Sequence, residues 1–126
     1  MRILVIDDDE TFCRYLSEVL TDLGHTATWV SDGLLGFEQC LRESYDAVVC
    51  DVRMPLILGT ELLAELRRDR PEQCFILISA FADEQLEAQA REQRAYLISK
   101  PFEAPVLANI LNDIATQRGA MQRELP

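Results

Sequence analysis

Polar residues able to bind an ion or a phosphoryl group follow the short apolar segments of this 126-residue chain. In sequence order these residues are Asp7, Asp8, Asp51, Ser79 and Lys100. Lys100 is the only lysine, and the remaining positively charged side chains are arginines. A chain that otherwise uses arginine therefore has one compact, point-like ammonium group, shortly after an apolar segment.

The chemistry that these side chains could perform together is phosphoryl transfer. Carboxylates held close together repel one another, and a hard divalent cation such as Mg²⁺ relieves that repulsion. A cation beside Asp51 would also neutralise an approaching phosphate, and a carboxylate can accept a phosphoryl group covalently. Lys100 could then bind one phosphoryl oxygen as a point charge, and Ser79 could donate a hydrogen bond to another. The residue types therefore predict a Mg²⁺-dependent phosphoacceptor site centred on Asp51.

The elements that would position this site form five βα units. Apolar runs predict strands at residues 3–6, 27–30, 47–50, 75–78 and 96–98. Helical periodicity marks the segments 12–23, 32–43, 62–66, 83–92 and 106–114. Such a succession predicts an α/β fold with a doubly wound five-stranded parallel sheet, in the flavodoxin-like order 2-1-3-4-5, and helices on both faces. Ligands bind at the carboxyl ends of the strands in such a sheet, which is where the five polar residues fall.

Signals at the ends of the expected helices support these boundaries. Asp9 and Glu10 are expected to cap the first helix, and Ser31 or Asp32 the second. Gly24 suits the C-terminal end of the first helix. The helix over residues 83–92 carries alanines where a firm apolar stripe would carry leucine, so it is the element most ready to shift.

Length and composition are those of one globular domain, expected over residues 1–118, with a tail or the start of a linker at 119–126. The net charge of −10 opposes direct binding to nucleic acid or an anionic membrane. The start of the chain is too short before its first acids for a secretion signal, which favours a cytoplasmic protein. Buried, reduced thiols are expected for the four cysteines, which are Cys13, Cys40, Cys50 and Cys74.

Four motifs together resemble the receiver domain of two-component response regulators, the CheY-like superfamily. The segment 3–9 resembles the acidic end of the family's first strand, and the segment 51–55 with Gly59 resembles its phosphoacceptor loop. Ile78-Ser79-Ala80 and Lys100-Pro101-Phe102 match the family's hydroxyl and lysine motifs. The resemblance covers roughly residues 2–118 of the chain.

The resemblance implies a role in phosphorelay signal transduction. Asp51 would accept a phosphoryl group from a phosphohistidine on a sensor histidine kinase or a phosphotransfer protein, and Ser79 and Lys100 would bind that group. The implied ligands of Mg²⁺ are Asp7, Asp8, Asp51 and the backbone carbonyl of Arg53. The domain would be a switch rather than a conventional enzyme, catalysing only its own phosphoryl transfer and slow autodephosphorylation. The Lys100–Pro101 peptide bond would be cis.

Partner binding is implied for the face formed by the helix 83–92, the strand 96–98 and the final helix. Phosphorylation would change the affinity of this face for a downstream output domain or protein. A homodimer is a further possible assembly, with no face assigned to it.

Three positions depart from the usual pattern of the family. Leu97 stands where an aromatic residue is common, with Tyr96 one step earlier, so either the strand has slipped or aromatic switching is weakened. Leu56-Ile57-Leu58 replaces small and acidic residues, and forms either a docking surface or a segment folded under the loop. Arg53, at the mouth of the site, is predicted to alter the lifetime of the phosphoryl group.

Two other functions fit part of the pattern. Asp7-x-Asp9-x-Thr11 also matches the motif of haloacid-dehalogenase-type phosphatases, although the chain is short for such an enzyme. A docking module that is never phosphorylated is the second alternative. Asp7→Asn would inactivate the phosphatase, whereas Asp51→Asn would remove the phosphoryl group of a receiver.

Overall fold

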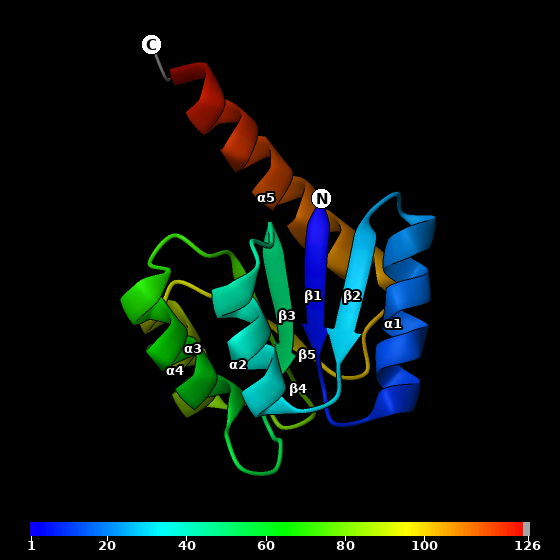
Figure 1. The fold of residues 1–126 in the computed structure, drawn as a ribbon, viewed down its shortest axis with the longest axis vertical. Helices are drawn as coiled ribbons and strands as arrows, with labels where there is room; N and C mark the ends of the chain where they lie inside the picture. Colours follow the sequence, from blue (N-terminus) through cyan, green and yellow to red (C-terminus); the bar gives the residue numbers. More distant parts are fainter. Residues whose placement is uncertain (125–126) are drawn as a thin grey trace.

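The computed structural model describes residues 1–124 and shows a parallel sheet covered by helices on both faces (Figure 1). The strands are β1 (Arg2–Ile6), β2 (Thr26–Val30), β3 (Ala47–Asp51), β4 (Phe75–Ser79) and β5 (Tyr96–Ser99). The helices are α1 (Glu10–Asp22), α2 (Gly33–Arg42), α3 (Gly59–Asp69), α4 (Glu84–Glu92) and α5 (Ala104–Glu124). The five strands pair in parallel in the order β2-β1-β3-β4-β5, so the predicted fold class and strand order are confirmed.

The core consists of two apolar layers, one on each face of the sheet. Successive side chains of a strand point to opposite faces, so Leu4 and Ile6 pack with α2, α3 and α4. Ile3 and Val5 pack on the other face with α1 and α5. Every residue of β3 and β4 is buried, because helices cover both faces of these inner strands. This continuous burial explains why the inner strands read as uninterrupted apolar runs in the sequence.

Aspartate side chains cap the N-termini of three helices. Asp9 accepts a hydrogen bond from the backbone N–H of Phe12, which confirms its predicted role at the start of α1. Asp32 caps α2, which decides between the two residues proposed for that position. Asp83 caps α4 in the same way. Gly24 follows α1 with a φ angle of 93°, a left-handed conformation that suits glycine at a helix end.

Helix α5 is longer than the sequence predicted and projects beyond the sheet (Figure 1). Its backbone remains helical through Glu124, so the first part of the expected tail is helical. Glycine inside a helix costs only about 1 kcal/mol, so Gly119 does not end this one. Arg118 forms an ion pair of 2.7 Å with Asp46, which ties the middle of α5 to the start of β3. The boundary at residue 118 stays a prediction, and residues 125–126 lie outside the described part.

The cysteines are free thiols, as predicted, and three of them are buried. Burial raises the pKa of both Cys13 and Cys40 to about 12, so these thiols stay protonated and unreactive at neutral pH. Cys74 lies just before β4 and is only partly buried, so the predicted burial is wrong for this cysteine. Over residues 1–124, no helix is both long enough and apolar enough to span a bilayer.

Candidate functional site

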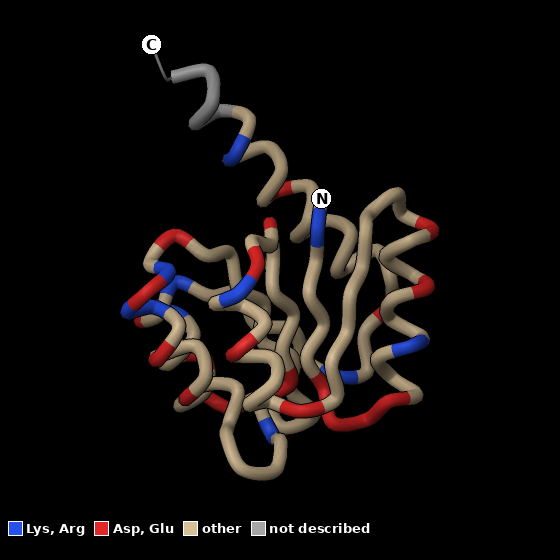
Figure 2. The backbone as a smooth tube through the Cα atoms, in the orientation of Figure 1, with Lys and Arg blue, Asp and Glu red and all other residues tan. Residues whose placement is uncertain are grey.

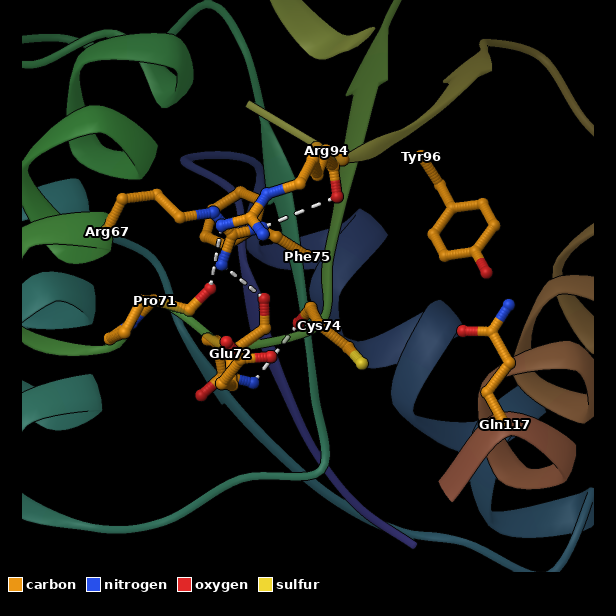
Figure 3. A pocket seen from close by; sticks show the side chains of 10 residues that line it. Arg67, Pro71, Glu72, Cys74, Phe75, Arg94, Tyr96 and Gln117 are labelled. Atoms are coloured by element: carbon orange, nitrogen blue, oxygen red, sulfur yellow. Dashed lines mark hydrogen bonds between the residues drawn. The ribbon is translucent and has the colours of Figure 1, made fainter. Parts of the chain in front are cut away.

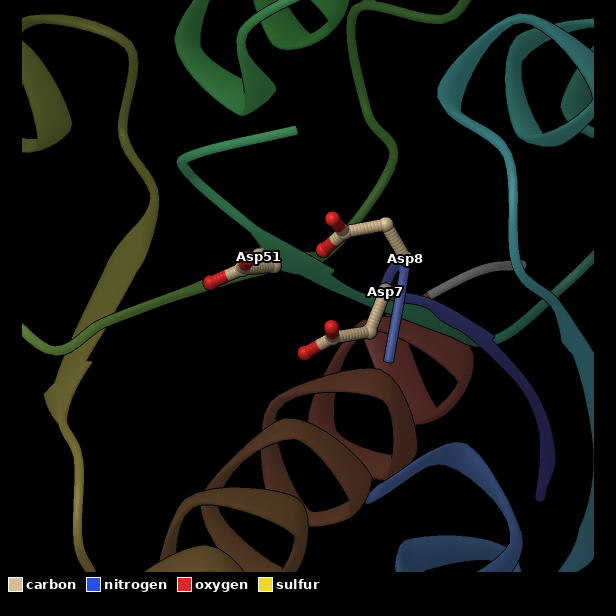
Figure 4. A group of neighbouring side chains, drawn as sticks. All are labelled: Asp7, Asp8 and Asp51. Carbon is tan, nitrogen blue, oxygen red and sulfur yellow. The ribbon is translucent and has the colours of Figure 1, made fainter. Parts of the chain in front are cut away.

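The carboxylates of Asp7, Asp8 and Asp51 meet at one edge of the sheet (Figure 4). They follow or end the neighbouring strands β1 and β3, in which Ile6 lies opposite Cys50. One oxygen from each of the three side chains lies within 4.8 Å of the others. Figure 2 shows the acidic residues gathered where β1 passes into α1. The structure therefore brings together the three predicted carboxylate ligands.

Lys100 enters this cluster from the segment after β5. Its Nζ atom lies 2.8 Å from an oxygen of Asp7 and 3.5 Å from an oxygen of Asp51. The Lys100–Pro101 peptide bond is cis, as predicted. The lone ammonium therefore lies beside the carboxylates, at the sheet edge that the sequence predicted.

Ser79 ends β4, the strand that pairs with β3 next to Asp51. The serine is 2% exposed, and its hydroxyl oxygen accepts a hydrogen bond of 3.0 Å from the backbone N–H of Phe81. Because the hydroxyl acts as an acceptor in this contact, its own proton remains available for donation. Ser79 therefore lies at the predicted edge and links the site to the loop that precedes α4.

The charges at the site are unbalanced, with three carboxylates facing one ammonium. Burial, together with the nearby charge of Asp7, raises the pKa of Asp51 to about 6, although Lys100 opposes this effect. Burial by itself lowers the pKa of Lys100, but its hydrogen bond to Asp7 and the charge of Asp51 raise the pKa overall. Lys100 is therefore positively charged, and the remaining negative charge favours a bound cation.

The surroundings of the carboxylates suit a hydrated divalent ion. Asp7 is 1% exposed and Asp51 is 8% exposed, whereas the side chain of Asp8 faces solvent. An ion held between them would have protein oxygens on one side and water on the other, which is the arrangement that Mg²⁺ prefers. The donor set thus fits Mg²⁺, while the role of the Arg53 carbonyl as a further ligand stays a prediction.

Arg53 and Phe81 form a contact at the mouth of the site that the sequence did not reveal. The guanidinium of Arg53 lies 5.0 Å from the centroid of the Phe81 ring. The two residues come from the loops after β3 and β4, and together with Ser79 they border a hollow of about 390 Å³. Phe81 is 67% exposed, and a large apolar residue directly after the hydroxyl motif was the available signal.

Gly59 allows the backbone of α3 to approach the acceptor strand. A Cβ atom at this position would lie 2.3 Å from the carbonyl oxygen of Asp51 and 3.0 Å from the Cα of Val52. The N–H of Gly59 donates a hydrogen bond of 2.8 Å to the carbonyl of Val52. Gly59 therefore fixes the position of Asp51 by close packing of backbone on backbone.

The apolar loop after Asp51 shows both of the expected arrangements, one at Ile57 and the other at Leu56 and Leu58. Ile57 folds inward and packs beside Met54 against the first residue of α2, Gly33. Leu56 has a φ angle of 73° and is 82% exposed, and Leu58 is 44% exposed. The inward-folded arrangement is thus confirmed for Ile57, and a docking role for the exposed leucines stays a prediction.

Strand β5 has not slipped in register. Ser99 lies opposite Ser79, and Leu97 packs on the face of the sheet that α4 covers. Tyr96 lies on the other face and donates a hydrogen bond from its hydroxyl to Asp113 of α5. The alternative of a local slip is therefore wrong, and weakened aromatic switching at Leu97 stays a prediction.

A second hollow, of about 290 Å³, lies at the opposite edge of the sheet near the starts of β4 and β5 (Figure 3). Arg67 crosses it and donates hydrogen bonds to the carbonyls of Gln73 and Gln93, at 2.5 and 3.0 Å. This arginine therefore joins the ends of α3 and α4, and its role is structural.

Comparison with known proteins gives the family. The model of the response regulator receiver domain matches residues 3–112, so the chain belongs to this family. It is 35% identical over 110 residues to a response regulator receiver protein of Anaeromyxobacter, covering 86% of this chain and 46% of the relative. It is 32% identical over 120 residues to the transcriptional regulatory protein QseB of Haemophilus influenzae, covering 94% and 54%. The chain thus spans about half the length of these two relatives.

Solved structures of receiver domains share the fold. The BeF3-activated DrrB receiver domain has a TM-score of 0.82 and 26% identity, covering 91% of this chain and 97% of that one. The response regulator TrrA of Thermotoga maritima, in complex with Mg²⁺–BeF, has a TM-score of 0.81 and 26% identity, covering 90% and 97%. The protein is a receiver domain of the response-regulator type, a signalling switch.

In a phosphatase of the haloacid-dehalogenase type, Asp9 would have to act as the acid/base residue, and its position in the structure does not suit that role. Asp9 is committed to capping α1, where its carboxylate accepts a hydrogen bond of 3.2 Å from the backbone N–H of Phe12. Asp8 instead completes the carboxylate cluster. Together with the family assignment, this placement argues against the phosphatase.

Proposed function

We propose that Asp51 accepts a phosphoryl group from a phosphohistidine on a sensor histidine kinase or phosphotransfer protein in a Mg²⁺-dependent reaction. The observation that carries the proposal is the meeting of three carboxylates within 4.8 Å beside the only lysine of the chain. An oxygen of Asp51 would attack phosphorus, and the bond to the donor imidazole would break with its electron pair remaining on nitrogen.

Each residue of the cluster has a distinct part in this reaction. Asp7, Asp8, Asp51 and the Arg53 carbonyl would hold Mg²⁺, which when bound supplies positive charge against the developing charge of the transferred group. Lys100 lies 3.5 Å from the attacking carboxylate and would bind a phosphoryl oxygen through its ammonium. Ser79 would donate its hydroxyl proton to another phosphoryl oxygen. The domain would catalyse only its own phosphorylation and slow autodephosphorylation.

The contact between Ser79 and Phe81 suggests how the signal leaves the site. If Ser79 turns toward the phosphoryl group, its hydrogen bond with the N–H of Phe81 is strained or lost, and the loop before α4 must follow. Helix α4 buries only Leu86 and Ala90, so little apolar packing opposes its movement. The face formed by α4, β5 and α5 would then change its affinity for a downstream output domain or protein, or for a second copy.

The first prediction concerns this coupling. Phosphorylation should change the hydrogen-exchange rates of backbone amides in residues 81–98, because the two states differ in the packing of α4. Mass-spectrometric exchange before and after phosphorylation measures the effect, with Asp51→Asn under the same conditions as the control. Unchanged exchange in this segment of the phosphorylated protein would contradict the proposed output face.

The second prediction concerns the lifetime of the phosphoryl group. Arg53→Ala removes the guanidinium that lies over Phe81 at the mouth of the site, so access of water to the phosphoryl group should change. A dephosphorylation time course that differs from the wild type by more than about twofold is expected, since such contacts contribute about 0.5–1 kcal/mol at exposed sites. Identical time courses would contradict this role of Arg53.

The wider role of the protein follows from the same proposal. Relatives such as QseB are transcriptional regulators, so an output domain or partner that acts on transcription is a reasonable recipient of the signal. The net charge of −10 makes direct nucleic acid binding by this domain unfavourable. We place the domain in the cytoplasm, together with its phosphodonor.

Binding of beryllofluoride tests the proposed site without a partner protein. Two structural relatives carry this group in an activated or Mg²⁺-bound form. Fluorine NMR should show bound beryllofluoride in the wild type with Mg²⁺, and none with a chelator or in Asp51→Asn. A bound signal that persists in Asp51→Asn would show that the acceptor has been assigned to the wrong residue.

A further inference from the structure

The ring of Phe12 lies against the ammonium group of Lys100. The Nζ atom of Lys100 is 4.2 Å from the centroid of the Phe12 ring. Phe12 belongs to the first turn of α1, where the side chain of Asp9 holds its N–H. Phe102 packs edge-on against the same ring at 6.3 Å, with an interplanar angle of 83°. The ring of Phe12 therefore extends from α1 onto the segment after β5, where it contacts both Lys100 and Phe102.

This geometry is that of a cation–π contact. The negative face of an aromatic ring attracts an ammonium group within about 6 Å of its centroid, and the attraction increases when the pair is shielded from water. The side chain of Lys100 is only 23% exposed, so the contact is partly shielded. The lysine is therefore held from two directions, by the carboxylates of Asp7 and Asp51 and by the ring of Phe12.

We propose that Phe12 is a positioning residue for phosphoryl transfer, and that its ring keeps the ammonium of Lys100 directed at the acceptor carboxylate. This inference rests on the proposed function of Asp51. A cation held by Asp7 and Asp51 would compensate part of their negative charge, and the two carboxylates would then attract Lys100 less strongly. The ring ligates neither the cation nor the phosphoryl group, so its contact persists throughout the reaction and preserves the position of the lysine.

Ordinary apolar packing is the competing explanation, because Phe12 also borders the apolar layer beneath α1. A leucine would satisfy packing but has no π face, whereas a tyrosine keeps the face. The pair Phe12→Leu and Phe12→Tyr therefore separates the two explanations. Tyr15→Leu is the matched control, since it removes another aromatic ring from the same helix, 6.5 Å from that of Phe12.

Two measurements on these four proteins test the inference, with thermal unfolding confirming that each is folded. The first is the rate constant for phosphorylation by acetyl phosphate at saturating Mg²⁺. The second is NMR of protein labelled with ¹³C,¹⁵N-lysine, which gives a single set of side-chain signals because the chain has one lysine. The ring should shift the protons on Cε of Lys100 upfield and slow the exchange of its ammonium protons with water.

We expect Phe12→Leu to lower the rate constant of phosphorylation by about three- to tenfold and to speed the exchange of the ammonium protons with water. This change in rate corresponds to the loss of a partly shielded cation–π contact. Phe12→Tyr and Tyr15→Leu should behave like the wild type in both measurements. Wild-type phosphorylation in Phe12→Leu would overturn the inference, and so would slower phosphorylation with unchanged lysine exchange. If even the wild type is not phosphorylated, the proposed function fails, while the lysine signals still decide whether the ring holds the ammonium.

Discussion

Gly59→Ala is expected to lower the free energy of unfolding by about 2–4 kcal/mol, because it introduces a backbone clash in the core. The new methyl group would lie 2.3 Å from the carbonyl oxygen of Asp51, and backbone atoms cannot rotate away as a side chain can. Either α3 or the end of β3 must move, so the acceptor carboxylate should be displaced as well. Urea unfolding at equilibrium measures the loss of stability, and the rate of phosphorylation by acetyl phosphate measures the displacement.

Gly119→Ala is the matched control for this substitution. It places the same methyl group on another helical glycine, where no described atom beyond the neighbouring residues and backbone of its own helix lies within 4 Å of the added carbon. Because alanine is a better helix former than glycine, this variant should be unchanged or more stable by up to about 1 kcal/mol. Equal stability of Gly59→Ala and Gly119→Ala would contradict the close packing of α3 on the acceptor strand.

Asp51→Asn is expected to raise the free energy of unfolding of the metal-free protein by about 1–3 kcal/mol at pH 8. Burial and the charge of Asp7 raise the pKa of Asp51 from 3.8 to about 6, and a shift of two pKa units corresponds to about 3 kcal/mol. The ionised carboxylate therefore destabilises the folded protein, and asparagine removes that charge. Lys100 loses one ion-pair partner in the variant, so the gain should fall below the full amount.

The sign of the pH dependence follows from the raised pKa. The folded protein binds a proton on Asp51 more tightly than the unfolded chain does, so this stabilisation is complete below about pH 4 and is lost as the pH rises through about 6. In the presence of a chelator, the difference in the free energy of unfolding between Asp51→Asn and the wild type should therefore become smaller from pH 8 to pH 5. Saturating Mg²⁺ should reverse the order at pH 8, because only the wild type retains all three carboxylates. A difference that stays constant from pH 5 to pH 8 without metal would contradict the buried charge.

The parts of the fold that could be predicted from the sequence depend on short-range patterns, namely apolar runs, strand ends and helix caps. The inner strands read as apolar runs because both of their faces are covered, and the acids after them lie at the edge that parallel topology dictates. Asp9 and Asp32 cap helices through contacts with residues two or three positions ahead. The three carboxylates and Lys100 could be placed for the same reason, since each ends a strand or follows one within two residues.

The features that could not be predicted from the sequence are of two kinds. Some depend on contacts between segments that are distant in the chain, and others depend on small differences in conformational free energy. The ring of Phe12 reads as part of an apolar helix stripe, and its position over Lys100 follows only from the way α1 and the segment after β5 meet. The division of the loop into inward Ile57 and exposed Leu56 depends on one positive φ angle at Leu56. Helix α5 continues because one glycine is a small penalty against the helix formers around it.

The central claim, that Asp51 is the phosphoacceptor, is tested most directly by intact mass after incubation with acetyl phosphate. Wild type and Asp51→Asn should each be measured with Mg²⁺ and with a chelator. The proposed site predicts one phosphoryl adduct in the wild type that requires Mg²⁺ and is absent from Asp51→Asn. No adduct in the wild type, or an equal adduct in the variant, would contradict it and would favour phosphorylation-independent docking or another acceptor.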